Sequence, residues 1–427
     1  MTNSANNGVY AVPQGWVQYT VDQIKALDRH ACVAGPFGSN ISSKYFVEYG
    51  VPVIRGSNLR DDLTRFVSDT FAFVSHQQAA NYKPQYVKSS DLVFTCWGTI
   101  GQIGIIPDNT EYEYFIISNK QLKLAVNRNI VNPLFCFYYF CSPQYVDYIR
   151  GRNIGGAVPG INLGILKSLP IAAPSLLKQD RIVEILAAYD DLIVNNERRI
   201  ALLNRSAQLL FDEWFVRLRY PNHQKDKIVN GVPNRWRMGS VADFFDTSSG
   251  GTPSRKNPEF YAGTVNWVKT QELNDNFIIN TDEKITEEAI RNSSAKIFPA
   301  NTVLVSMYGG TNIGRTGILA EPAATNQACC ALVPKDRRAH FIFCALFFRH
   351  NRQRLMSLAQ GSAQTNISQN VIRSFPMLLP SSTLMTSFFD TLSPSFAQMK
   401  NIEGHNKQLR YARDLLLPRL MDGRIAV

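Results

Sequence analysis

Apolar residues recur at alternating spacings of four and three over residues 182–214, which is the heptad pattern of a coiled-coil helix. Residues 388–420 repeat the pattern at a constant offset of 206 residues, with three polar interruptions. Two such helices on one chain can pair, most simply antiparallel; the alternative is two amphipathic helices that each pack on a separate domain. The predicted seam positions are Ile182, Leu186, Tyr189, Ile193, Asn196, Ile200, Leu203 and Leu210, then Phe388, Leu392, Met399, Ile402, Asn406, Leu409 and Leu416.

The same offset joins two segments that precede these helices. "GGAVPGINLGILKSLPIAAP" (155–174) matches "GSAQTNISQNVIRSFPMLLP" (361–380) at six positions, including both prolines near the end. Further upstream the offset is larger, as the correspondence of "TIGQIGII" (99–106) to "NIGRTGIL" (312–319) shows. Loops of a globular domain tolerate insertions, whereas paired helices must keep their register. The chain therefore reads as two copies of one unit, each a variable globular part followed by a helical part of fixed length.

Short runs rich in β-branched and aromatic residues, bounded by Gly, Pro or Asn, predict strands in both globular parts. These runs include residues 51–56, 91–98, 121–126, 265–270 and 302–310. Each part also contains one probable helix rich in aromatic residues, over 132–151 and 339–358. Arg349, Arg352 and Arg354 at the end of the second helix look like a basic edge.

We therefore predict an α+β fold with two tandem α/β domains, separated by two long helices that form an antiparallel coiled coil, in a pseudo-twofold internal repeat. The predicted boundaries are 1–176 for the first domain, 177–218 for the central helical spacer, 219–381 for the second domain and 382–427 for the C-terminal helical spacer.

The charge of the chain points to a polyanionic partner. Forty-five Lys and Arg against 34 Asp and Glu give a net charge of +11, so nucleic acid is the first candidate, and a basic protein with nothing bound is the alternative. The seven cysteines lie mostly in apolar runs and none has CxxC spacing, which favours reduced thiols over disulfides or a zinc site. No segment has transmembrane length and no signal peptide is recognisable, so we expect a soluble cytoplasmic protein without membrane contact.

Motifs for catalysis are absent or incomplete. There is no GxxxxGK loop, no HExxH and no histidine cluster. "NPLF" (132–135) is similar to the loop with which amino-methyltransferases hold a flipped base, but its third residue is Leu134 and no glycine-rich cofactor loop follows a nearby strand. "DEK" (282–284) has the look of a nuclease motif but lacks an acidic partner. We expect no catalytic residue, metal or cofactor in this chain.

Polar loops at corresponding places in the two halves are the candidate DNA contacts. Residues 34–46 and 248–261 combine glycines and hydroxyl groups with basic residues, which suits phosphate. In 53–59 and 267–273 a strand ends in Arg or Lys and polar residues follow, which suits base edges, although turn formation alone is an alternative for each residue. The candidates are Ser39, Lys44, Arg55, Ser57, Asn58, Trp97, Thr99, Gln102 and Arg152 in the first half, and Thr252, Ser254, Arg255, Lys256, Lys269, Thr270, Gln271, Tyr308, Thr311, Asn312, Arg315, Gln364, Thr365 and Asn366 in the second.

Taken in order, these motifs resemble the specificity (S) subunit of type I restriction–modification systems over essentially the full chain. The motifs are "VPQGW" and "VPNRW", "GPFGS", "GGTPSRKNPEFY", "WVKTQEL", "SMYGGTNIGRTGIL" and the segment before each helix. The first half departs from the second at Pro159 and Gly160, where the second half has Thr365 and Asn366.

The resemblance implies that each globular domain is a target-recognition domain for one half of a split, asymmetric DNA sequence, with the helices as a ruler between them. It implies double-stranded DNA as ligand and two methyltransferase (M) subunits that methylate adenine N6 with S-adenosylmethionine. Restriction (R) subunits, which use ATP and Mg²⁺, are the further expected partners. Two alternatives stay open: an orphan DNA-binding scaffold, and a chain with its own methyltransferase or nuclease activity.

Overall fold

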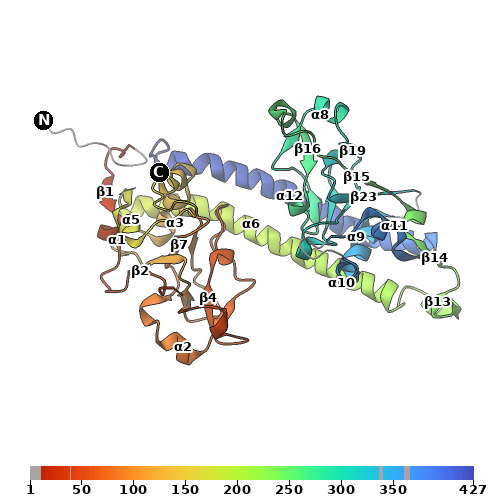
Figure 1. Ribbon diagram of the computed structural model, residues 1–427, viewed down its shortest axis with the longest axis horizontal. Coiled ribbons are helices and arrows are strands. Elements are labelled where there is room, and N and C mark those ends of the chain that lie inside the picture. The colour runs from red at the N-terminus through yellow and green to blue at the C-terminus, as the bar shows by residue number, and fades with distance from the viewer. Residues whose placement is uncertain (1–10, 39, 336–339, 360–365) are drawn as a thin grey trace. The chain divides into compact units, whose positions relative to one another are not determined.

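The computed structural model describes residues 11–38, 40–335, 340–359 and 366–427, and many of its elements are labelled in Figure 1. The chain forms two compact units. The first comprises Met1–Ile193 and Leu409–Val427, and the second comprises Val194–Gln408.

Three sheets build the first unit. The short outer pair is antiparallel, β1 (Val17–Thr20) with β11 (Pro170–Ala173). The second sheet has the order β2 (Cys32–Ala34), β10 (Gln121–Leu124), β7 (Leu92–Thr95) and β8 (Ile103–Ile105). The third has the order β3 (Phe46–Val47), β5 (Ala72–Val74), β4 (Val51–Ile54), β9 (Phe115–Ile117) and β6 (Tyr86–Val87), and its β4–β9 pair is parallel.

The second unit repeats this arrangement. Its outer pair is β14 (Arg237–Ser240) with β24 (Pro376–Leu379). The next sheet has the order β15 (Phe245–Ser249), β23 (Cys329–Pro334), β20 (Val303–Ser306), β21 (Thr316–Leu319) and β17 (Asn276–Ile278). The last has the order β18 (Lys284–Ile285), β16 (Val265–Val268), β22 (Ala323–Thr325) and β19 (Ile297–Phe298), again with one parallel pair, β16–β22. A hairpin of β12 (Ile228–Val229) and β13 (Val232–Pro233) is added. The predicted internal repeat is therefore confirmed at the level of strand topology.

Short helices cover the sheets of both units. Those of the first unit are α1 (Val21–Ile24), α2 (His76–Ala80), α3 (Pro133–Cys141), α4 (Pro143–Arg150) and α5 (Leu163–Ser168). Those of the second are α7 (Val241–Phe244), α8 (Glu287–Arg291), α9 (Phe341–His350), α10 (Arg352–Ser357) and α11 (Gln369–Ser374). Each of the two aromatic-rich helices that we predicted, over 132–151 and 339–358, is in fact two helices. The break between α3 and α4 follows from Pro143, which has no N–H and starts a new helix at its first position.

The two long helices are α6 (Leu176–Phe211), continued by a π-helical turn Asp212–Val216, and α12 (Ser382–Met421). In the first unit the start of α6 and the end of α12 share one core, with Leu186 and Leu417 both buried in it. In the second unit Asn196 Nδ2 donates a hydrogen bond to Asn406 Oδ1 at 2.7 Å, and the rings of Trp214 and Phe388 lie 5.5 Å apart. The order of these contacts is antiparallel, as predicted.

The seam itself drifts from the predicted positions. Tyr189 is only half-buried, and the neighbouring Asp190 is the buried residue. At the other end Leu416 is half-buried while Leu417 is buried. An α-helix has 3.6 residues per turn, so a straight helix rotates away from a strict heptad stripe. The other predicted seam residues are buried or half-buried.

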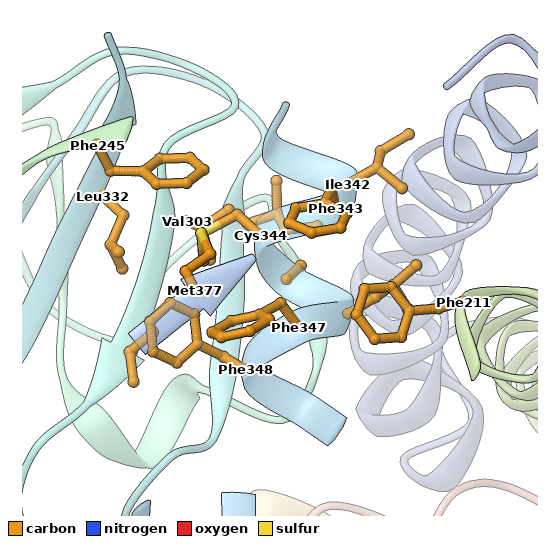
Figure 2. Close-up of a cluster of buried hydrophobic side chains, with 14 of the residues drawn as sticks. Phe211, Phe245, Val303, Leu332, Ile342, Phe343, Cys344, Phe347, Phe348 and Met377 are labelled. Carbon is orange, nitrogen blue, oxygen red and sulfur yellow. The ribbon is translucent and has the colours of Figure 1, made fainter. Parts of the chain in front are cut away.

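The core of the second unit is built around α9, as Figure 2 shows. Phe343 and Phe347 lie between the sheet and Phe211 of α6, and the rings of Phe343 and Phe211 are 5.5 Å apart. The predicted basic edge after this helix is wrong for Arg349, whose guanidinium is buried and donates to Asn204 Oδ1 and to the Asp275 carbonyl oxygen.

All seven cysteines lie in described residues and all are free thiols, six of them buried, as expected for reduced cysteines.

Candidate nucleic-acid interface

A polar cleft of about 560 Å³ opens in the first unit beside the ends of β4 and β7. Its lining is rich in hydrogen-bond donors and contains no carboxylate. The polar side chains come from four segments of the chain, of which Thr95 ends β7 and Gln121 begins β10: Ser42, Ser43, Arg55, Ser57, Thr95, Thr99, Ser118, Asn119, Lys120 and Gln121. A neutral-to-cationic surface of this kind is complementary to DNA, in which both the phosphates and most base edges offer acceptors.

Hydrogen bonds hold these segments in place. The Gln121 side chain donates to the Ile54 carbonyl oxygen at 3.2 Å and accepts from the Gly56 N–H at 3.2 Å. Asn119 Nδ2 donates to the carbonyl oxygen of Gly38 at 2.8 Å. The cleft is therefore formed by the fold itself and does not depend on a ligand for its shape.

Two side chains of the cleft differ in their access to an external partner. Thr95 is 3% exposed, and within the described residues its Oγ1 has no hydrogen-bond partner, which is costly for a buried hydroxyl. Trp97 is 41% exposed at the rim. One face of its ring lies on Gly160, where any Cβ would collide with the indole, and a backbone bridge joins the two residues. The rest of the ring is left open to solvent.

Asn58 is a correction to the sequence prediction. We predicted a base-reading amide, but Asn58 is 1% exposed. Its Oδ1 accepts from the Arg55 N–H at 2.9 Å, and its Nδ2 donates to the carbonyl oxygens of Val67 and Thr70. The same place in the second unit holds Glu272, which accepts from the Lys269 N–H at 2.7 Å. The side chain at this place therefore caps a turn and cannot reach a base.

In the second unit one carboxylate brings two predicted contact residues together. Lys269 Nζ lies 2.8 Å from Glu283 Oε1, and Arg255 Nη1 lies 2.6 Å from Glu283 Oε2. Hydrogen bonds from Arg255 and then Lys269 lower the pKa of Glu283 to about 2, so the carboxylate stays ionised. Two loops that are far apart in the sequence are thus joined through one side chain.

The remaining candidates are exposed or half-buried, and several are held by local bonds. In the first unit the ammonium of Lys44 lies over the Tyr45 ring, Thr99 donates to Gln102, and the guanidinium of Arg152 lies over the Tyr148 ring. In the second, exposed side chains are those of Thr252, Ser254, Lys256, Gln271, Tyr308 and Thr311, and half-buried ones are those of Thr270, Asn312, Arg315 and Asn366.

Tyr308 forms a backbone bridge with Asn366, just as Trp97 does with Gly160. Ser39, Gln364 and Thr365 lie outside the described residues. Thr95, Ser118 and Lys120 were missed by the sequence analysis because only the fold brings the ends of β7 and β9 beside Arg55.

The motifs that resemble catalytic ones have structural roles. Asn132 of "NPLF" caps α3: its Oδ1 accepts from the Leu134 N–H at 2.8 Å, and its Nδ2 donates to Asp180 at 2.8 Å. Over residues 11–38, 40–335, 340–359 and 366–427, no cluster of three or more His, Cys, Asp or Glu side chains is arranged to hold a metal ion. In the same part of the chain, no helix combines the length and apolar character needed to cross a membrane.

Comparisons of the sequence and the fold with known proteins all indicate the same family. The type I restriction modification DNA specificity domain matches twice, over residues 36–205 and 233–410. The HindI specificity subunit of Haemophilus influenzae is 24% identical over 381 residues, covering 74% of this chain and 83% of that protein. The MjaIX specificity subunit of Methanocaldococcus jannaschii is 21% identical over 425 residues, covering 97% of this chain and 95% of that protein.

The crystal structure of the type I S subunit from M. genitalium has the same fold, with a TM-score of 0.53 at 14% identity and 98% coverage of both chains. With two specificity domains in tandem, this chain belongs to the type I restriction–modification specificity subunits, a family of non-catalytic DNA-recognition subunits.

Proposed function

We propose that each compact unit of this chain contacts one half of a bipartite, asymmetric DNA target. The observation that carries this proposal is the carboxylate-free cleft of the first unit, with the exposed side chains of Arg55 and Trp97 along it. The match of one specificity domain in each half of the chain supports one DNA-contacting surface per unit.

Asymmetry of the target follows from differences between equivalent positions. Arg55 corresponds to Lys269: they follow β4 and β16, the strands that pair in parallel with β9 and β22. Arg55 lines a cleft without carboxylates, whereas Lys269 Nζ lies 2.8 Å from Glu283 Oε1. Because the equivalent cations have different surroundings, the two units read different bases.

The partners of the chain are proposed on family grounds. Two methyltransferase subunits bind it and methylate adenine N6 with S-adenosylmethionine, and restriction subunits add cleavage that depends on ATP and Mg²⁺. The complex works in the cytoplasm. The helical segments over 177–218 and 382–427 act as the spacer between the recognition domains 1–176 and 219–381. The hydrogen bond between the buried Asn406 and Asn196 supports this role, because such pairs fix helix register.

The test is selection of bound sequences from random duplexes by the chain in complex with its methyltransferase subunit. We expect two enriched blocks separated by a fixed number of unread base pairs. Arg55→Ala removes an exposed cation that lines the cleft, so it should change base preference in one block and leave the other unchanged. Lys88→Ala, an exposed cation that does not line the cleft, is the matched control. Random enrichment, or altered preference in both blocks, would contradict the proposal.

A further inference from the structure

The Arg255 side chain in the second unit is fixed on two sides. Its Nη1 lies 2.6 Å from Glu283 Oε2, which pins one end of the guanidinium. Its flat face lies over the Tyr261 ring, 4.0 Å from the centroid, and the Trp267 centroid is 5.4 Å away. An arginine held by a carboxylate and an aromatic face has lost most of its rotamer freedom before any ligand arrives.

The platform beneath Arg255 is itself rigid. Tyr261 donates its hydroxyl hydrogen to the Pro253 carbonyl oxygen at 2.6 Å, and Trp267 Nε1 donates to the Gly251 carbonyl oxygen at 3.0 Å. Gly251 has no room for a Cβ, which would collide with Ser294. The loop that carries Arg255 is therefore tied to the same two rings on which the guanidinium rests.

The opposite edge of the guanidinium is open. The Arg255 side chain is 56% exposed, and Nε and Nη2 have no hydrogen-bond partner among the described residues. These two nitrogens form a side edge with two nearly parallel N–H donors, and Nη1 is not part of that edge. Guanine presents O6 and N7 in the major groove at the spacing that accepts such a pair of donors.

Glu283 distinguishes this arrangement from a phosphate contact. A carboxylate 2.6 Å from the guanidinium opposes the approach of an anion, and it also neutralises part of the charge of Lys269. The same carboxylate improves a base contact, because it sets the direction of the open edge. Arg55 of the first unit resembles Arg255 only in having an aromatic neighbour: its guanidinium lies 5.8 Å from the centroid of the Phe46 ring.

We infer that Arg255 reads a guanine in the half-site of the second unit through its open edge, with Glu283 and Tyr261 as positioning residues. The inference rests on the proposed function and makes it specific: the block read by the second unit contains a guanine whose O6 and N7 both accept from Arg255.

The test starts from the selected duplex and the complex of this chain with its methyltransferase subunit. Each guanine of the second half-site is replaced singly by 7-deazaguanine, which lacks only the N7 acceptor. We expect one of these replacements to weaken binding about tenfold. Arg255→Ala should bind the natural duplex more weakly and show no further loss at that position. Arg255→Lys, which keeps the charge and loses the fork, should behave like Arg255→Ala.

Lys256→Ala is the matched control, because Lys256 is an exposed cation on the same loop. It should weaken all sequences alike and keep the sensitivity to 7-deazaguanine. Glu283→Gln should reduce discrimination at that guanine while raising affinity for unrelated DNA, since a negative charge is removed. A purely structural role of Glu283 would not produce the second effect.

Three outcomes would overturn this inference and leave the proposed function intact. The first is a natural complex whose DNA binding is insensitive to every 7-deazaguanine replacement, and the second is an Arg255→Ala variant that keeps the sensitivity. The third is an Arg255→Ala variant that binds all sequences equally more weakly, with a salt dependence of binding lower by about one counterion. A complex that selects no split sequence would overturn the proposed function as well.

Discussion

The buried ion pair between α6 and α12 in the first unit gives a sharp test of how the helices are held. Arg413 Nη1 lies 2.7 Å from Asp190 Oδ1, and both residues are 5% exposed. The other carboxylate oxygen, Asp190 Oδ2, accepts from the Tyr138 hydroxyl at 2.5 Å. Arg413→Met would leave the buried Asp190 carboxylate with only the more distant Arg65, whose Nη2 lies 3.9 Å from Asp190 Oδ2.

Breaking a buried pair by removing one partner costs about 3–5 kcal/mol, whereas removing both charges costs much less. Arg413→Met and Asp190→Leu should therefore each be strongly destabilising. The double variant should be less destabilised than the sum of the single variants by about 2 kcal/mol or more, with the residual cost coming from the lost hydrogen bond between the Tyr138 hydroxyl and Asp190.

The neighbouring carboxylate is the matched control. Asp191 is paired with Arg65 Nη1 at 2.9 Å, but its side chain is 67% exposed. Asp191→Asn should cost less than about 1 kcal/mol. The two carboxylates are adjacent in the sequence, but Asp190 is buried against Arg413 and Tyr138, whereas Asp191 is exposed beside Arg65.

Hydrogen–deuterium exchange resolved by peptide is the appropriate assay, because a chain with two compact units need not unfold in a single step. The free energy of opening is read from the core peptides of α3 and β11. A loss of 3 kcal/mol accelerates their exchange by more than about 100-fold. Additive single variants, or an Asp191→Asn effect as large as that of Asp190→Leu, would refute the reasoning.

Three further predictions concern other sites. Replacing Asn196 and Asn406 together by Leu should stabilise the second unit by about 1–2 kcal/mol, because the buried Asn406 Nδ2 has no hydrogen-bond partner among the described residues. Urea unfolding measures this stability, and an unchanged value would contradict the prediction. Gly160→Ala should displace the ring of Trp97 and weaken DNA binding as much as Trp97→Ala does, with no added effect in the double variant. Glu283 has a folded pKa of about 2 against an ordinary 4.5, so its stabilising effect is complete above about pH 4.5 and is lost as the pH falls toward 2. Glu283→Gln should therefore show a smaller drop in melting temperature between about pH 5 and pH 3 than the natural chain, and an equal drop would argue against the ion pairs.

Two kinds of feature could be predicted from the sequence: helices marked by a heptad period, and segments that repeat at a constant offset. The heptads give both long helices, and the constant offset after Gly155 gives the paired helical parts, because insertions there would break the seam. The drift from Tyr189 to Asp190 could not be foreseen, since the heptad pattern assumes a fixed rotation per residue. The choice of Asp190 as the buried residue depends on Arg413, which lies more than 200 residues away.

The sequence identified the loops of the candidate site, but it did not identify which side-chain atoms face the cleft. Arg55, Ser57, Trp97 and Thr99 line one cleft as their loops indicated. Asn58 failed because an amide after a strand can either cap a turn or face a base, and sequence alone does not choose. Thr95 escaped notice because its buried hydroxyl is informative only once its missing partner is known.

A map of N6-methyladenine tests the central claim most directly. The chain is expressed with its methyltransferase subunit in a host that lacks adenine methylation, and the modified sites are read across the genome. The account predicts one split motif with two specific blocks and a fixed gap, and Arg255→Ala should relax a guanine in one block only. Methylation at a single undivided motif, or relaxation of both blocks by that one variant, would contradict the reading of separate half-sites by the two units.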